Sequence, residues 1–91
     1  MKVFSKEELN EELKTLQDWH EVEAAIEKSF VFADFKKALG FIVQVGILAE
    51  QADHHPEIWN VYHKVKIRLN THSANAITNL DIDLAKQIDT L

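Results

Sequence analysis

The stretch that decides the fold is WNVYHKVKIRL, residues 59–69. Polar and apolar side chains alternate along it, and the apolar set is Trp59, Val61, Val65, Ile67 and Leu69. A repeat of two is typical of a β-strand that turns one face to an apolar core, as in an antiparallel sheet. The run is longer than most strands, so we expect it to bend or to split into two strands.

Two further strands are predicted earlier in the chain. The runs Trp19–Glu23 and Ile26–Phe32 are short and contain β-branched and aromatic residues, which favours a hairpin. Apolar side chains fall on one face of the second run, and Lys28 is the exception on that face. The chain therefore supplies three or four strands to one sheet.

Helices are predicted on both sides of these strands. Ser5 followed by Glu8 is a capping-box pattern, and leucines at helical spacing then predict a helix over about residues 6–17. Asp34 is a candidate N-cap for a second helix, which ends at or just before Pro56.

A third helix is predicted at the end of the chain, where Thr78 with Asp81 resembles a helix start and apolar residues follow at helical spacing. The predicted order is α-β-β-α-β-β-α. This is an α+β fold, in which three helices cover one face of an antiparallel sheet of about four strands.

The second predicted helix is apolar on nearly all sides. One stripe consists of Phe35, Ala38, Leu39, Ile42, Val45, Ala49 and Ala52, while Phe41, Val43, Ile47 and Leu48 lie outside it. Such a helix is usually buried on more than one side. In a chain of 91 residues one sheet covers only one side, so we expect the other side to meet another subunit.

Length, charge and composition exclude several classes of function. A length of 91 residues predicts a single domain over residues 1–91, and the formal charge of −5 argues against direct nucleic-acid binding. The chain has no cysteine, which excludes disulfides, thiolate nucleophiles and cysteine metal sites. The longest apolar stretch, Phe41–Ala49, is too short to cross a membrane, and the N-terminus lacks a signal-peptide pattern. We therefore expect a cytoplasmic protein.

Candidate chemistry centres on histidine, the side chain best suited to proton transfer near neutral pH. His54 and His55 are adjacent between a helix and a strand, and His72 follows the long strand. If the strand runs back past the helix end, His72 approaches the pair. Glu50 and Asp53 are close enough in sequence to orient an imidazole or bind a polar ligand.

Other polar residues have simpler interpretations. The sequence favours an exposed hairpin position for His20. It favours a structural role for His63, which is in phase with the core face of the long strand. On local grounds Asp81 is a helix-start carboxylate favoured by the helix dipole. Ser73 lies beside His72 without a recognisable nucleophile elbow.

A metal site is the rival interpretation of the histidines. Three imidazoles with carboxylates nearby resemble the ligand set of a catalytic zinc. However, adjacent residues of an extended chain point to opposite sides, and no HExxH or comparable spacing is present. We therefore predict no metal.

An ordered set of residues then identifies a family. Glu50, His54-His55-Pro56, Tyr62, His72 and Asp81 have the spacing E-x3-H-H-P-x5-Y-x9-H-x8-D. This pattern is similar to the signature of the pterin-4a-carbinolamine dehydratases, and the resemblance extends over essentially the whole chain. Three positions differ from many relatives, namely Ile58-Trp59 after the Pro-Glu pair, His63 after the tyrosine, and Asn70 before Thr-His.

The resemblance implies a hydro-lyase that removes water from a 4a-hydroxytetrahydropterin by general acid–base catalysis. It implies a pterin substrate and requires no metal or other cofactor. The implied catalytic residues are His54, His55, His72 and Asp81, with proton transfer assigned to His54 and His72. The implied substrate-binding residues are Glu50, Asp53, His54, His55, Pro56, Trp59, Asn70, Thr71, His72 and Ser73.

The resemblance also leaves an alternative function open. Animal relatives act as a dimerisation cofactor of a homeodomain transcription factor, through the helix surface that they use for self-association. For this chain we expect a homodimer that pairs through the sheet and a homotetramer formed through the second helix. A complete histidine set favours the enzyme over a pure interaction module.

Overall fold

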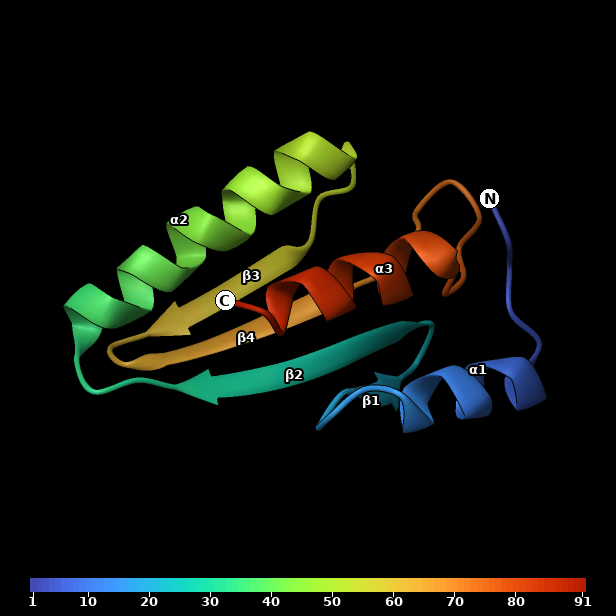
Figure 1. The fold of residues 1–91 in the computed structure, drawn as a ribbon, viewed down its shortest axis with the longest axis horizontal. Coiled ribbons are helices and arrows are strands. Elements are labelled where there is room, and N and C mark those ends of the chain that lie inside the picture. Colours follow the sequence, from blue (N-terminus) through green and yellow to red (C-terminus); the bar gives the residue numbers. More distant parts are fainter.

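The computed structural model describes residues 1–91, and it has the predicted α+β fold. The elements, in order, are α1 (Lys6–Lys14), β1 (His20–Val22), β2 (Ala25–Val31), α2 (Phe35–Ala52), β3 (Glu57–Val61), β4 (Lys64–Leu69) and α3 (Asn79–Ile88). The four strands form one antiparallel sheet in the order β1-β2-β4-β3. Figure 1 shows the sheet with the three helices arranged along it.

The stretch at 59–69 is a hairpin rather than one strand, with a turn at Tyr62-His63 between β3 and β4. Val61 lies opposite Lys64, and Trp59 lies opposite Lys66. A two-residue turn reverses the alternation, because residues directly opposite one another share a face. The expectation of one apolar face through all five residues is therefore wrong.

Exposure shows the same reversal. Trp59 and Val61 are 51% and 53% exposed, on the face that the helices leave open, whereas Val65, Ile67 and Leu69 are buried in the core. His63 lies in the turn and not on the core face of a strand, so that expectation is also wrong.

The core lies between the sheet and the helices. It joins side chains from all three helices to β2 and β4. Lys28 does lie on the core face of β2, opposite Ile67. Its ammonium is 2.9 Å from one carboxylate oxygen of Asp89, and the indole of Trp19 donates to the other oxygen at 3.0 Å. A pair with a carboxylate explains how a lysine is accommodated there.

α2 turns a different set of residues inward from the one predicted. Ala38, Phe41, Val45 and Ala49 are buried, so Phe41 belongs to the inner face. Phe35, Leu39, Val43 and Ile47 recur every four residues and are exposed. The helix thus presents a continuous apolar stripe outward, here called the outer stripe of α2. No helix of the chain is long and apolar enough to cross a membrane.

The candidate catalytic histidines lie on segments at one end of the molecule. The turn from α2 into β3 carries His54 and His55, and the segment from β4 to α3 carries His72. Both lie toward the right of Figure 1, at the end away from the β3–β4 turn. The fold therefore brings together two segments that are separated by a whole hairpin in sequence.

Candidate active site

A fully buried carboxylate, that of Asp81, lies at the centre of this end. It is the third residue of α3, where it completes a capping box with Thr78. Its Oδ2 accepts hydrogen bonds from the backbone N–H of Thr78 at 2.9 Å and from the hydroxyl of Thr71 at 2.8 Å. Its Oδ1 lies 2.5 Å from Nε2 of His54. Burying a carboxylate is costly without such partners, and here every side of the group has one.

The end of α2 aims His54 at that carboxylate. Asp53 takes a left-handed conformation with φ of 49°, and its N–H bonds the carbonyl of Glu50 at 3.2 Å. The N–H of His54 bonds the carbonyl of Ala49 at 3.0 Å. This is a Schellman motif, which reverses the chain direction within two residues. Pro56 follows, where the chain cannot return to a helix.

The hydrogen bonds around Asp81 determine where the proton between Asp81 and His54 lies. Oδ2 of Asp81 already accepts from two donors, which stabilises the ionised carboxylate. The proton between Oδ1 and the imidazole therefore belongs to Nε2 of His54, which donates to Asp81. Nδ1 is then the ring atom left to exchange a proton with another molecule. His54 is 9% exposed, so the ring is held firmly with a limited opening to solvent.

His55 points outward. Its Nε2 lies 2.7 Å from Oε1 of Glu50 in the last turns of α2, and both side chains are exposed. An exposed pair of this kind contributes little to stability because water screens the charges. Both groups are therefore accessible to a polar ligand.

His72 lies in a short loop whose base is fixed. The backbone of Thr71 pairs with Ala76, and the carbonyl of His72 accepts from the N–H of Asn75 at 3.1 Å. The side chains of His72 and Ser73 are exposed, and neither makes a hydrogen bond within the chain. The loop presents His72 beside Thr71, whose hydroxyl is bound to Asp81.

Asn70 and Trp59, the remaining predicted binding residues, lie outside the Asp81–His54 pair. The Asn70 side-chain amide donates to the carbonyl of Ala24, which anchors the end of β4. Trp59 lies on the open face of the sheet, whereas Asp81 lies in a helix on the other face. Hydrogen bonds thus join His54, Thr71 and Asp81. His72 follows Thr71 directly in the chain, and Trp59 lies apart from them.

Thr78 is the member of the cluster that the sequence did not reveal. The pattern of Thr78 with Asp81 predicted only a helix start, which is confirmed. A signal for a larger role was the apolar sequence around Thr78, just before the closing helix, and around Asp81 within it, since buried polar side chains require partners.

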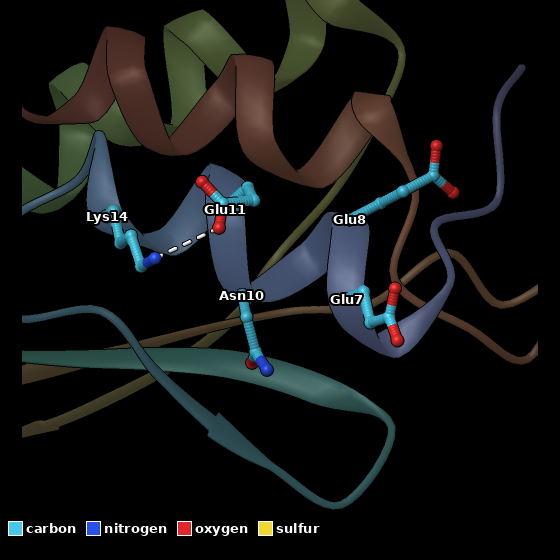
Figure 2. A pocket seen from close by; sticks show the side chains of 5 residues that line it. All are labelled: Glu7, Glu8, Asn10, Glu11 and Lys14. Atoms are coloured by element: carbon cyan, nitrogen blue, oxygen red, sulfur yellow. Dashed lines mark hydrogen bonds and ion pairs between the residues drawn. The ribbon is translucent and has the colours of Figure 1, made fainter.

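The five main surface hollows lie elsewhere. None of the five main hollows is lined by His54, His55 or His72. Figure 2 shows one of them on α1, lined by Glu7, Glu8, Asn10, Glu11 and Lys14, with Lys14 paired to Glu11. The pKa of Glu8 falls to about 2, because Lys2 bonds its carboxylate and the backbone of Ser5 donates to it. Of these residues, Glu8 belongs to the cap of α1.

Metal-ligand geometry is absent as well. No three His, Asp or Glu side chains are grouped so that they could hold a metal ion. The hydrogen bonds instead join the buried carboxylate of Asp81 to the imidazole of His54, while the exposed imidazole of His55 pairs with Glu50.

Comparisons with known proteins agree on one family. The family model described as pterin 4 alpha carbinolamine dehydratase matches residues 2–91. Relatives from Brucella ovis and Brucella canis are each 43% identical over 90 residues, covering 97% of this chain and 93% of theirs. Both carry the name pterin-4-alpha-carbinolamine dehydratase provisionally.

Two solved structures have a similar fold. The crystal structure of a transcriptional coactivator/pterin dehydratase from Brucella melitensis has a TM-score of 0.93 and 42% identity, covering 97% of this chain and 96% of that one. A pterin dehydratase-like protein, identified as a RuBisCO assembly factor in the alpha-carboxysome, has a TM-score of 0.67 and 18% identity. It covers 82% of this chain and 87% of that one, and the likeness is one of fold.

Proposed function

Because this chain belongs to the pterin-4a-carbinolamine dehydratase family, we propose that it removes water from a 4a-hydroxytetrahydropterin to give a quinonoid dihydropterin. The observation that carries the proposal is the buried Asp81–His54 pair, with the loop of His72 bound to the same carboxylate. All three residues belong to the ordered pattern by which the sequence resembles the family.

The proposed reaction needs two proton transfers. Hydroxide is a poor leaving group, so a protonated imidazole donates a proton to the oxygen while the bond from carbon 4a to that oxygen breaks. The neighbouring ring nitrogen supplies the electron pair and loses its proton to a second group, which leaves a carbon–nitrogen double bond and one water. We assign these transfers to His54 and His72. The step is redox-neutral and needs no cofactor.

Asp81 has an electrostatic role in this proposal. When Nδ1 of His54 takes up a proton, the imidazolium is stabilised by the carboxylate 2.5 Å from Nε2. The same contact holds the ring in one orientation, so that Nδ1 faces the reacting atoms. The arrangement resembles other acid–base pairs in which a carboxylate orients a histidine.

The exposed residues of the end are proposed to bind the pterin. His55 and Glu50 present donors and acceptors to a polar heterocycle, and Asp53 and Pro56 lie beside them in sequence. His72 and Ser73 are proposed to contribute from the loop after β4. Asp53 holds a left-handed conformation that glycine adopts at lower cost. Its exposed carboxylate, beside His54, gives a functional reason for an aspartate there. Trp59 and Asn70 contribute to the pterin site only indirectly in this proposal.

A stopped assay tests the function directly. A phenylalanine hydroxylase generates the 4a-carbinolamine, and the chain is expected to speed its disappearance above the spontaneous rate. The variant His20→Gln is the matched control, because His20 is an exposed histidine of β1 outside the cluster. If the chain neither accelerates the loss nor changes the ultraviolet spectrum of dihydrobiopterin, the dehydratase proposal fails.

The outer stripe of α2 favours a second property. Four large apolar side chains at Phe35, Leu39, Val43 and Ile47 face outward on one helix, and such patches usually mark an interface. We propose that other copies of the chain cover it in a homotetramer of sheet-paired homodimers. A role as dimerisation cofactor of a transcription regulator, through the same stripe, is the alternative function. A cytoplasmic location also stays a prediction.

Sedimentation tests the proposed self-association through the outer stripe of α2. The chain is expected to sediment as a tetramer at micromolar concentration, and Val43→Glu is expected to yield a smaller species, because a charge would be buried in the apolar contact. The matched control is Lys36→Glu, an exposed position on the same helix outside the stripe. A wild-type monomer would contradict the self-association proposal.

A further inference from the structure

We propose that Thr71 and Thr78 are positioning residues, which set the protonation pattern of the Asp81–His54 pair and bind the His72 loop to it. The inference rests on the proposed function insofar as His54 and His72 transfer protons. It deepens that function by naming two residues that act through Asp81. Its main readout concerns the imidazole itself and needs no substrate.

The two hydroxyls form a chain with one direction. Oγ1 of Thr78 accepts from the backbone N–H of Leu80 at 3.2 Å, and it lies 2.7 Å from Oγ1 of Thr71. The hydroxyl of Thr71 donates its single proton to Asp81. Thr78 must therefore donate to Thr71, since each hydroxyl has only one proton. Both threonines are buried, so no water competes for these bonds.

This direction determines where the negative charge lies. The threonine chain and the N–H of Thr78 both donate to Oδ2 of Asp81. Two donors on one oxygen exclude a proton there and favour the ionised carboxylate. The shared proton is thereby kept on Nε2 of His54, and Nδ1 is left as the exchanging atom. Without the hydroxyl of Thr71, the carboxylate loses one of its two Oδ2 donors.

The same hydroxyl joins the two histidine segments. Thr71 immediately precedes His72, and its backbone N–H and carbonyl pair with Ala76 across the loop. Its side chain is bound to the carboxylate that holds His54. One buried group thus fixes both ends of the proposed acid–base pair. A network of this kind transmits a change at Thr71 to His54 and to His72 together.

Nitrogen-15 NMR of ring-labelled histidine tests the inference. In the wild-type chain, neutral His54 is expected to show a single tautomer with the proton on Nε2. Thr71→Val, which keeps the shape and removes the hydroxyl, is expected to replace this with a mixture in which Nε2 is partly unprotonated. Thr71→Ser restores the donor and should restore the wild-type pattern. Thr90→Val is the control, because Thr90 donates to Gln87 at the exposed end of α3.

Kinetics provide a second readout. We expect kcat of Thr71→Val to fall about tenfold with KM changed by less than about twofold, because ring position rather than binding is altered. Thr71→Ser is expected to remain within about twofold of wild type. A Thr71→Val spectrum identical to wild type would overturn the inference.

Two further outcomes are informative. If Thr71→Val fails to fold, the wild-type spectrum still decides, since a proton on Nδ1 of neutral His54 would overturn the inference by itself. If the NMR changes occur but wild type has no dehydratase activity, the positioning role stands and the proposed function fails. The two proposals therefore fail through different measurements.

Discussion

His54→Gln is expected to lower kcat for carbinolamine dehydration by about 10²–10⁴-fold, the range typical of general acid–base catalysis. Glutamine retains an N–H that can donate to Asp81, so the buried carboxylate keeps a partner. What it lacks is a group that takes up and releases a proton near neutral pH. The loss should therefore appear in kcat, measured in the coupled hydroxylase assay, with little change in the denaturation midpoint.

The matched variants make this result specific. His72→Gln should give a loss of similar size, and the double variant should lose less than the product of the two, because both groups act in one step. His20→Gln should leave kcat unchanged, since His20 is exposed at the edge strand β1. Wild-type rates for both His54→Gln and His72→Gln, with an intact fold, would refute the acid–base assignment.

The order of elements was predictable because it depends on local patterns. Ser5 with Glu8 and Thr78 with Asp81 form the capping boxes that their spacing indicates. Which side chains of β3 point toward the core was not predictable in the same way. Whether Trp59 faces the core depends on the length of the turn at 62–63, and a change of one residue there exchanges the two faces. Periodicity alone carries no information about that turn.

The sequence also could not assign the inner and outer sides of α2. Its apolar residues are too numerous for the sequence to distinguish an inner from an outer side, so Phe41 and Leu39 exchanged places between prediction and structure. Only the docking of the helix on the sheet makes that distinction. Lys28 is similar, because its partner Asp89 lies 61 positions away and no local pattern joins them.

The family was predictable from a set of residues, whereas the hydrogen-bonded network around Asp81 was not. The ordered histidines, Glu50 and Asp81 mark the family, whereas the two threonines look like ordinary loop and cap residues in the sequence. Their role arises because β4 ends beside the start of α3 and within reach of the turn after α2. The local interpretation of Asp81 as a helix-start carboxylate was correct but incomplete, since one oxygen caps the helix and the other holds His54.

Asp81→Asn is expected to separate these two functions of the carboxylate. The amide oxygen can still accept from Thr71 and from the N–H of Thr78, so α3 keeps its cap. The amide nitrogen then faces His54 and donates to Nε2, which forces the ring proton onto Nδ1. Neutral His54 thereby loses its lone pair at the exchanging atom, and its imidazolium loses the adjacent negative charge. We expect kcat to fall by at least about 100-fold, with the fold retained.

Asp81→Leu should instead damage the fold. It leaves the Thr71 hydroxyl, the Thr78 N–H and the His54 ring without their acceptor in a buried region. Breaking a buried pair by removing one partner costs about 3–5 kcal/mol, a large part of the stability of a small domain. Urea unfolding measures that loss, and the nitrogen-15 spectrum of Asp81→Asn reports the tautomer. An asparagine variant with wild-type kcat and the proton on Nε2 would show that the charge of Asp81 serves the helix alone. A fall in kcat together with the proton on Nδ1 would establish that the carboxylate directs His54.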